Sequence, residues 1–108
     1  MKKSAGRRQE QRDRAAVFKA LGHPARLRIV EEVAAGERCV CELVAAAGLG
    51  WSAVSRHLAV LRAAGVLADE KRGPQVFYRL ALPCVRSFTE CLQAARRGEA
   101  VEVRRCCS

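Results

Sequence analysis

Several features are missing from this 108-residue chain, and each absence narrows what the protein can be. No apolar run approaches the roughly 20 residues that span a membrane as a helix. The first residues lack the apolar core of a signal peptide, so we expect a cytoplasmic protein. The chain also lacks a phosphate-binding loop, a catalytic cysteine–histidine arrangement and a recognisable pair of catalytic carboxylates, which argues against an enzyme.

Acidic residues are in short supply. The chain carries 20 Lys and Arg against 11 Asp and Glu, a formal net charge of +9. This excess predicts a polyanionic partner, either nucleic acid or an anionic membrane surface. Residues 1–14 hold six of the basic side chains and form a basic arm that either contacts phosphates or is a solvated terminus. At this length we expect one compact domain, over residues 15–97, that shares its core in a dimer.

Hydrophobic spacing predicts a mainly helical α+β chain. Apolar residues recur at helical intervals in segments that end at glycine, and they alternate with polar residues on either side of Gly73-Pro74, as in a β-hairpin. This order is that of a dimeric winged helix-turn-helix with an extra helix at each end. Residues 98–108 are predicted to form a cysteine-containing tail. The expected elements are helices at residues 9–21, 24–36, 40–47, 52–65 and 83–97, and a hairpin over residues 66–82.

The second helix of the helix-turn-helix has the surface of a DNA-recognition helix. Ser52, which we expect to cap it, lies with Ser55 and Arg56 away from the apolar face, and the helix contains no acid. Serine hydroxyls and arginine can reach phosphates and base edges in the major groove. His57 lies beside the apolar face, where it serves either in packing or in DNA contact. Trp51 either packs at the helix start or touches the duplex backbone.

The tip of the predicted hairpin carries Lys71, Arg72 and Gln75. A wing at this place would run along the phosphates, so we expect Arg72 and Gln75 to contact DNA. Asp69 and Glu70 weaken this signal, because they place negative charge beside the same surface.

The cysteines indicate thiol chemistry. In a reducing compartment, six cysteines point to metal binding or redox chemistry. With two histidines and no CxxC pair, the thiolates of Cys39 and Cys41 suit a thiophilic ion. In a regular helix these thiols would point about 200° apart, so an ion bound to both would reshape the first turn. The alternative is that Cys39 precedes the helix in an extended segment and the pair is already formed. We expect Cys84 and Cys91 to be buried as small apolar residues.

Four segments resemble the ArsR/SmtB family of dimeric, winged-helix, metal-sensing repressors. They lie within residues 15–85 and read LGHPARLRIV, ERCVCEL, SAVSRHLAVLRAAGVL and KRGPQVFYRL. CVCEL is similar to the arsenic- and antimony-sensing branch, in which such a segment opens the first helix of the pair. The resemblance implies a homodimer on double-stranded operator DNA, released by arsenite or antimonite, with no organic cofactor and no membrane partner. It also implies that Cys39 and Cys41 are the principal thiolates.

Trivalent arsenic prefers three sulfurs, and the source of the third is open. The resembling branch often has a cysteine where this chain has Val44. Cys106 and Cys107 are the candidates, because an extended tail spans about 3.3 Å per residue and can reach Cys39 of its own or the partner chain. The zinc-sensing branch of the family carries a metal site on its last helix. We do not expect such a site here, because the last helix of this chain has no histidine.

Two other functions stay open at this point. A thiol redox sensor would use the same DNA-binding fold and oxidise Cys39, Cys41 or the Cys106–Cys107 pair. An enzyme such as a thiol-based reductase is the other class. Residues 9–21 and 83–97 are amphipathic and flank the winged helix, so we expect them to form the dimer contact.

Overall fold

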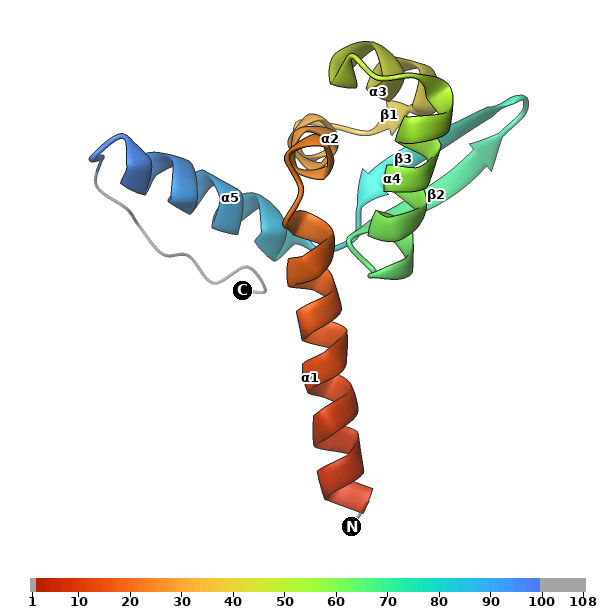
Figure 1. The fold of residues 1–108 in the computed structure, drawn as a ribbon. Coiled ribbons are helices and arrows are strands. Elements are labelled where there is room, and N and C mark those ends of the chain that lie inside the picture. The colour runs from red at the N-terminus through yellow and green to blue at the C-terminus, as the bar shows by residue number, and fades with distance from the viewer. Residues whose placement is uncertain (1, 100–108) are drawn as a thin grey trace.

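The computed structural model describes residues 2–99, with side chains described from residue 6 onward. It is a winged helix-turn-helix with an extra helix at each end, which confirms the predicted fold class (Figure 1). Cys106 and Cys107, the predicted ligands in the tail, lie outside the described residues. The elements are α1 (Lys2–Leu21), α2 (Pro24–Ala34), β1 (Arg38–Cys39), α3 (Val40–Ala47), α4 (Trp51–Ala63), β2 (Leu67–Arg72), β3 (Gln75–Leu80) and α5 (Pro83–Arg96).

Local sequence signals account for most helix boundaries. α2 begins at Pro24, whose missing N–H would have no helical partner, and the His23 side chain caps it by accepting a backbone hydrogen bond at 3.1 Å. α3 ends at Gly48, whose φ of +66° is left-handed and favours glycine. The expectation that Ser52 caps α4 is wrong. Gly50 is the N-cap, with an extended backbone, and the helix begins at the next residue.

β2 and β3 form the predicted hairpin. Leu67 lies opposite Leu80 at its base, and Arg72 lies opposite Gln75 at its tip. Between them the chain turns at Gly73, whose φ of +61° again favours glycine. The hairpin extends from the body as the wing (Figure 1), so the tip residues are placed where the sequence predicts them.

The sequence does not predict β1. This two-residue strand pairs antiparallel with β3, with Arg38 opposite Tyr78 and Cys39 opposite Phe77, so the sheet order is β1–β3–β2. Two residues are too few to show the period-two alternation that marks a strand. The pairing attaches the chain just before α3 to the wing.

Aliphatic side chains from every helix and from the hairpin meet in one core. Val30, Val54 and Leu61 are completely buried, and Leu43 brings α3 onto the same cluster. Burial of such side chains is the main force that holds a small domain together. The core cluster consists of Ala20, Leu21, Ile29, Val30, Val33, Leu43, Val54, Leu58, Leu61, Val66, Leu67, Tyr78 and Val85.

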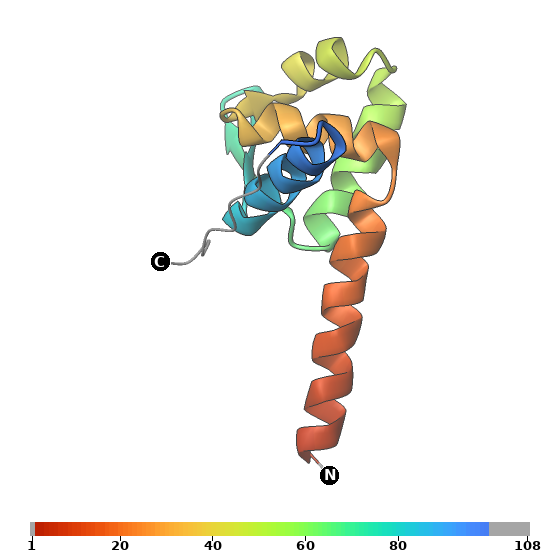
Figure 2. The same cartoon turned by 90° about the vertical axis from the view of Figure 1, so that its left-hand side faces the viewer.

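α1 leaves this core and projects from the body as a straight helix (Figures 1 and 2). It begins at Lys2, so the predicted start at residue 9 is wrong and the basic arm is a helical extension. Side chains 6–16 are all exposed, which is why apolar spacing gives no sign of this part of the helix. A hydrogen bond of 2.9 Å between Gln9 and Asp13, one turn apart, supports it locally.

α5 does not bury both of its cysteines. Val85 and Thr89 are its buried residues. Cys84 is exposed and Cys91 is half-buried, so the prediction that both cysteines are buried is wrong for Cys84. Cys84 lies on the first turn next to Val85, and successive helical residues point in different directions.

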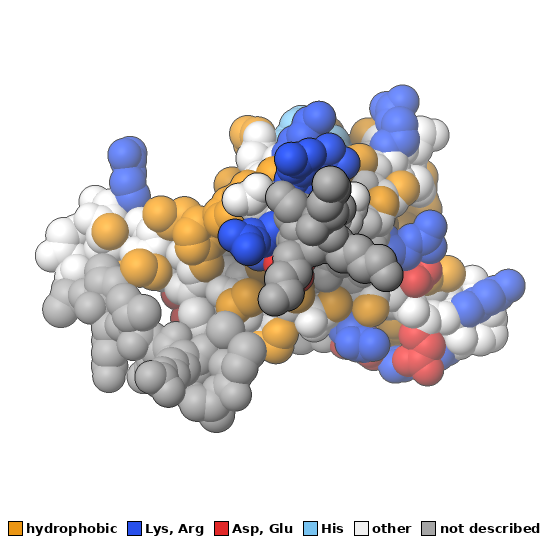
Figure 3. Space-filling model, turned by 90° about the horizontal axis from the view of Figure 1, so that it is seen from below, with side chains coloured by type: hydrophobic (Ala, Val, Ile, Leu, Met, Phe, Trp, Pro, Cys, Tyr) orange, Lys and Arg blue, Asp and Glu red, His pale blue; other side chains and the backbone are white. Residues whose placement is uncertain are grey.

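An apolar surface remains where α5 approaches the base of α1. Phe18 is 60% exposed, Phe88 43% and Leu92 52%, and the two phenyl rings meet edge to face with centroids 6.0 Å apart. Figure 3 shows hydrophobic side chains on this surface, over α5 and beside α1. Exposed apolar clusters of this kind mark association surfaces.

No single helix within residues 2–99 is long and apolar enough to cross a membrane. α3 and α4 taken together meet the same test of length and composition, although the break between them bends the pair by 110°.

Leu61 and Val60 are adjacent on α4 and provide a matched test of the core. Leu61→Ala should lower the free energy of unfolding by about 2–5 kcal/mol, because it opens a cavity at a completely buried site. Val60→Ala, at a side chain that is 40% exposed, should change it by less than about 0.5 kcal/mol. Urea unfolding at one fixed protein concentration measures both. Equal losses would contradict the assignment of the core face of α4.

Candidate nucleic-acid interface and thiol site

α4 turns a small, polar and basic surface away from the core. Val54 is buried on one side of the helix, whereas Ser52, Ser55 and Arg56 are exposed on the other. In the described part of the chain, no acidic side chain lies within ion-pair distance of Arg56. The structure therefore brings three of the predicted DNA contacts onto one face of one helix. Such a face can reach base edges and phosphates in the major groove.

His57 lies at the edge of this face and is half-buried. Its ring packs against His23, with centroids 4.7 Å apart and the planes inclined by 49°. Burial lowers the pKa of His57, and the nearby charges of His23, Arg26 and Arg56 lower it further. These surroundings fit the packing role. A contact between His57 and DNA stays a prediction.

The acids of the wing are engaged by arginines. Asp69 pairs with Arg62 of α4 at 3.0 Å, and Glu70 pairs with Arg72 at 2.7 Å. Charges of both signs therefore lie close together over the wing, as Figure 3 shows. Gln75 at the tip is exposed and adds no charge. The wing has less net positive charge than its arginines suggest.

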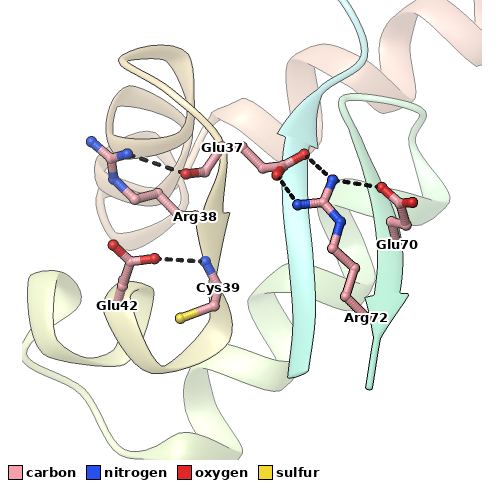
Figure 4. Close-up of polar contacts among 6 residues, drawn as sticks. All are labelled: Glu37, Arg38, Cys39, Glu42, Glu70 and Arg72. Carbon is pink, nitrogen blue, oxygen red and sulfur yellow. Dashed lines mark hydrogen bonds and ion pairs between the residues drawn. The ribbon is translucent and has the colours of Figure 1, made fainter. Parts of the chain in front are cut away.

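Arg72 ties the wing tip to the segment before β1. Its guanidinium donates to both carboxylate oxygens of Glu37, one of them at 3.0 Å, as well as to Glu70 (Figure 4). It also lies 4.7 Å from the centre of the Phe77 ring, within the range of a cation–π contact. The hydrogen bonds to Glu37 and Glu70 raise the pKa of Arg72. To contact a phosphate, Arg72 would exchange one ionic partner for another.

Cys39 and Cys41 lie together where β1 runs into α3. Cys39 is the last residue of β1 and the N-cap of α3, with an extended backbone (φ −79°, ψ 163°), and Cys41 is in the first helical turn. Their Cα atoms are 5.5 Å apart and a disulfide joins them. The prediction that both cysteines lie in a regular helix, with their thiols on opposite sides, is therefore wrong, because Cys39 is outside the helix. The extended alternative is confirmed.

A hydrogen bond between a side chain and the backbone stabilises this turn. The Glu42 carboxylate accepts from the Cys39 N–H at 3.0 Å, from the third residue of α3 back to its N-cap (Figure 4). This contact satisfies one donor at the helix start and fixes the direction in which the chain enters α3. Cys39 is 5% exposed, whereas Cys41 is exposed. The pair thus has one buried and one accessible cysteine.

The described residues supply two sulfurs to this site. Val44, at the position of the third cysteine in the resembling branch, is half-buried against the core. Cys84 and Cys91 are on α5 and are not brought to the pair. Within residues 2–99 no group of three or more His, Cys, Asp or Glu side chains is arranged to hold a metal ion. When reduced, the two cysteines are soft sulfur donors of the kind that thiophilic ions prefer.

Sequence reasoning missed the role of Glu37. It joins Arg72 across 35 residues of sequence, and both side chains are exposed, so neither hydrophobic spacing nor a local motif marks the contact. No signal in the sequence points to this contact. The structure shows that the thiol pair and the wing are held together through β1.

The geometry is that of a DNA-binding regulator, and comparison with known proteins agrees. A family model described as "Bacterial regulatory protein, arsR family" matches residues 23–69, from the start of α2 into β2. An uncharacterized HTH-type transcriptional regulator of Mycobacterium tuberculosis, Rv0081, is 41% identical over 85 residues, which cover 78% of this chain and 72% of that protein. The chain belongs to the ArsR family of bacterial regulatory proteins.

Two further relatives are an arsenic resistance regulator and a homodimeric DNA-binding domain. The arsenic resistance transcriptional regulator ArsR1 of Pseudomonas putida is 49% identical over 65 residues, 59% of this chain and 51% of that protein, so the chain spans about half of its length. A homodimeric winged helix-turn-helix domain of Mycobacterium bovis, Mb0332, superposes with a TM-score of 0.76 at 27% identity and 84% coverage of each chain. ArsR1 is named as a transcriptional regulator and Mb0332 as a possible ArsR-family transcriptional regulator, and neither is named as an enzyme.

The lowered pKa of His57 predicts a pH dependence of stability. In the unfolded chain this imidazole takes up a proton near its ordinary pKa of 6.5, whereas in the folded state it resists protonation. Its contribution is therefore present at a pH above 6.5 and is lost as the pH falls below that value. The urea concentration at the unfolding midpoint should decrease when the pH is lowered from about 7.5 to about 5.5. His57→Gln should make this decrease smaller. An unchanged pH profile in the variant would contradict the assignment.

Proposed function

We propose that this ArsR-family protein is a homodimeric transcriptional repressor that leaves its operator when trivalent arsenic or antimony binds Cys39 and Cys41. One observation carries the proposal: the extended backbone of Cys39 sets both cysteines side by side at the start of α3, the helix that precedes the recognition helix. Soft thiolates are the ligands that suit such ions. The similarity of this chain to ArsR1 of Pseudomonas putida supports the choice of arsenic. A repressor acts where its DNA is, so we expect it in the cytoplasm.

DNA would be read by α4 and steadied by the wing. Ser52, Ser55 and Arg56 face outward and are the proposed major-groove contacts, whereas Arg72 and Gln75 would lie along the phosphates. His57 would support α4 from behind or add one contact at its edge. The net charge of +9 supplies the attraction that is common to all DNA sequences.

The dimer would form through the apolar surface of α1 and α5. Phe18, Phe88 and Leu92 form an exposed apolar cluster of the kind that marks association surfaces, and the similar Mb0332 domain is a homodimer. Two recognition helices related by twofold symmetry would read half-sites about one helical turn apart, or a small multiple of it. The resulting operator is a rough palindrome.

Binding at the cysteines would reach DNA through β1. Cys39 pairs with Phe77 of β3. Glu37, which directly precedes β1, forms an ion pair with Arg72 at the wing tip. On the other side, α3 continues into α4 through the Gly48–Gly50 turn. A change in the backbone at Cys39 would therefore move both DNA-contacting elements. The ion shifts the equilibrium only by its differential affinity for the two states.

A second candidate is a thiol redox sensor, and the Cys39–Cys41 disulfide is the observation that favours it. Oxidation of the pair would remove two thiols and form one sulfur–sulfur bond, with two electrons passing to an oxidant such as peroxide. Arsenic needs the reduced pair, so the two inducers act on opposite forms of one site. Release of the operator by arsenite but not by peroxide supports the metalloid sensor, and the reverse result supports the redox sensor.

Phe88→Glu tests the dimer surface. A buried charge at the centre of the interface should weaken dimerisation by roughly 2 kcal/mol or more, as interface anchors do. Leu49→Glu, at another exposed apolar residue in the turn before α4, is the control and should leave the dimer intact. Sedimentation velocity over a concentration series measures both. A parent protein that is monomeric at micromolar concentration and still binds its operator specifically would contradict the proposal.

Arg56 and Arg72 should behave differently on DNA. Arg56→Ala should weaken binding to the operator by about 1–3 kcal/mol and relax the choice of base at its position. Arg72→Ala should weaken binding to every sequence and reduce the slope of log K against log salt by about one. Fluorescence anisotropy with operator and scrambled DNA at several salt concentrations measures both, with Arg28→Ala on α2 as the control.

The ionic partner of Arg72 supplies a further control for the same experiment. Glu37→Gln removes one carboxylate from Arg72 and should strengthen binding to scrambled DNA, because the guanidinium becomes available to phosphates. If Arg56→Ala and Arg72→Ala have the same effect across operator variants, the proposed division between base reading and phosphate contact is wrong.

Single cysteine variants test the inducer site. Cys39→Ser and Cys41→Ser should bind the operator as the parent does and should resist release by arsenite, because one sulfur of the pair is lost. Cys84→Ser, on α5, should leave both properties intact. Replacing Cys106 and Cys107 with serine should reduce sensitivity to arsenite if the tail supplies the third sulfur. If arsenite releases the Cys39→Ser variant from the operator at the same arsenite concentration as the parent protein, the proposed site is wrong.

A further inference from the structure

The half of α1 that leaves the body is rich in charge and buries nothing. Side chains 6–16 are all exposed, and at about 1.5 Å per residue they cover about 16 Å of helix (Figures 1 and 2). The core does not require these side chains, so their charges are available to a partner. The charged residues of this stretch are Arg7, Arg8, Glu10, Arg12, Asp13 and Arg14.

One line of basic side chains points away from the core. Successive helical residues are rotated by about 100°, so Arg8, Arg12 and Lys19 fall within about 40° of one another. All three are exposed, and we call them the outer row. Val17 and Ala20, which pack in the core, lie on the opposite side of the helix. The outer row is therefore presented to the surroundings of the protein along the length of α1.

The acids of α1 do not neutralise this row. By the same spacing, Glu10 and Asp13 lie on the side of the helix that faces the core further along. Asp13 accepts a hydrogen bond from Gln9, and within residues 6–99 no acidic side chain forms an ion pair with Arg8 or Arg12. Figure 3 views α1 from its free end and shows Lys and Arg side chains beside it. An unpaired line of positive charge suits a polyanion.

The base of α1 lies beside the recognition helix and on the proposed dimer surface. His23, two residues after α1, packs against His57 of α4, with ring centroids 4.7 Å apart. Phe18 belongs to the apolar surface and points about 100° to the side of the outer row, so dimerisation there leaves the row uncovered. In a twofold dimer on this surface, both α1 helices lie near the symmetry axis, between the recognition helices.

We propose that the outer row of α1 is an additional DNA contact, which binds phosphates of the operator between the two half-sites. The inference rests on the proposed function and deepens it, because it adds a contact surface beyond α4 and the wing. The twofold axis of a symmetric regulator passes through the centre of its operator, which brings α1 to that segment. Such contacts add affinity and fix the position of the dimer without reading bases.

Arginine is the side chain that suits this contact. Its planar guanidinium can donate two parallel hydrogen bonds to one phosphate, and it keeps its charge at any physiological pH. Arg8 and Arg12 are one helical turn apart, so their Cα atoms are separated by about 6 Å along the axis of α1. Each protomer thus offers two phosphate contacts, and Lys19 extends the row towards the body.

A double variant removes the contact and keeps the helix. Arg8→Gln with Arg12→Gln introduces residues of similar helix propensity, so α1 should stay helical. A dimer that loses four phosphate contacts should show a slope of log K against log salt that is smaller by about 3 to 4. Its affinity for the operator at about 0.1 M salt should fall roughly tenfold or more. Fluorescence anisotropy over a salt series measures both quantities.

The control removes the same charge from other helices. Arg28→Gln with Arg96→Gln changes exposed side chains of α2 and α5, which lie outside α1, α4 and the wing. At about 0.1 M salt, charges are screened over about 10 Å, so the slope for this variant should change by less than about one. Equal changes in the two double variants would overturn the inference, because the effect would then follow net charge alone.

Hydroxyl-radical footprinting locates the contact on the DNA. The parent protein should protect the half-sites and the backbone between them. The variant with Arg8→Gln and Arg12→Gln should protect the half-sites and lose the central protection. A parent footprint that is limited to the half-sites would overturn the inference.

The two proposals fail separately. If arsenite releases the parent protein from its operator while the outer row affects neither the salt slope nor the central footprint, the proposed function stands and the α1 contact is wrong. If the parent binds DNA through the outer row but arsenite does not release it, the α1 contact stands and the proposed inducer is wrong. Sedimentation covers the remaining partner: a variant that becomes monomeric would show that the outer row binds the second protomer, which overturns the inference.

Discussion

The pairing of β1 with β3 is the constraint on which the rest of this structure depends. Two residues of β1 are enough to hold Cys39 in an extended conformation and to place it opposite Phe77 in the wing. Because Cys39 is thereby the last residue before α3 and not part of it, Cys41 lies beside it. The same strand brings Glu37 to Arg72. One short contact thus creates the thiol pair and connects it to the wing.

Under the proposed function, this arrangement would let a small site influence a large interface. The thiol pair has α3 and the turn into α4 on one side and the wing on the other. Core packing holds α4 through Val54, Leu58 and Leu61, so we expect this helix to move with its surroundings as a unit. Packed elements of this kind shift between discrete arrangements. A ligand at the cysteines needs to favour only one of them.

Most of the fold was predictable because its signals are local. Helical spacing, Pro24 at the start of α2 and the Gly73 turn each act within a few residues, and together they identify the winged helix-turn-helix. The first half of α1 was not predictable, because residues 6–16 bury nothing and so have no apolar period. β1 was too short to have a period at all.

The site could be predicted only in part, for the same reason. The exposed face of α4 follows from its helical spacing, and the CVCEL segment marks the cysteines. The contacts of Arg72 with Glu37 and of His57 with His23 join residues that are distant in sequence. Such contacts depend on the tertiary structure, which a local pattern does not contain.

The central claim is that the thiol pair and the DNA-binding surface are two coupled sites. Thermodynamic linkage requires that, if arsenite weakens operator binding by some factor, operator DNA weakens arsenite binding by the same factor. The most direct measurement is therefore the arsenite affinity of the reduced protein, free and saturated with operator, in one buffer. We expect weaker arsenite binding in the DNA complex, by the factor found for release. Equal affinities in the two states would contradict it.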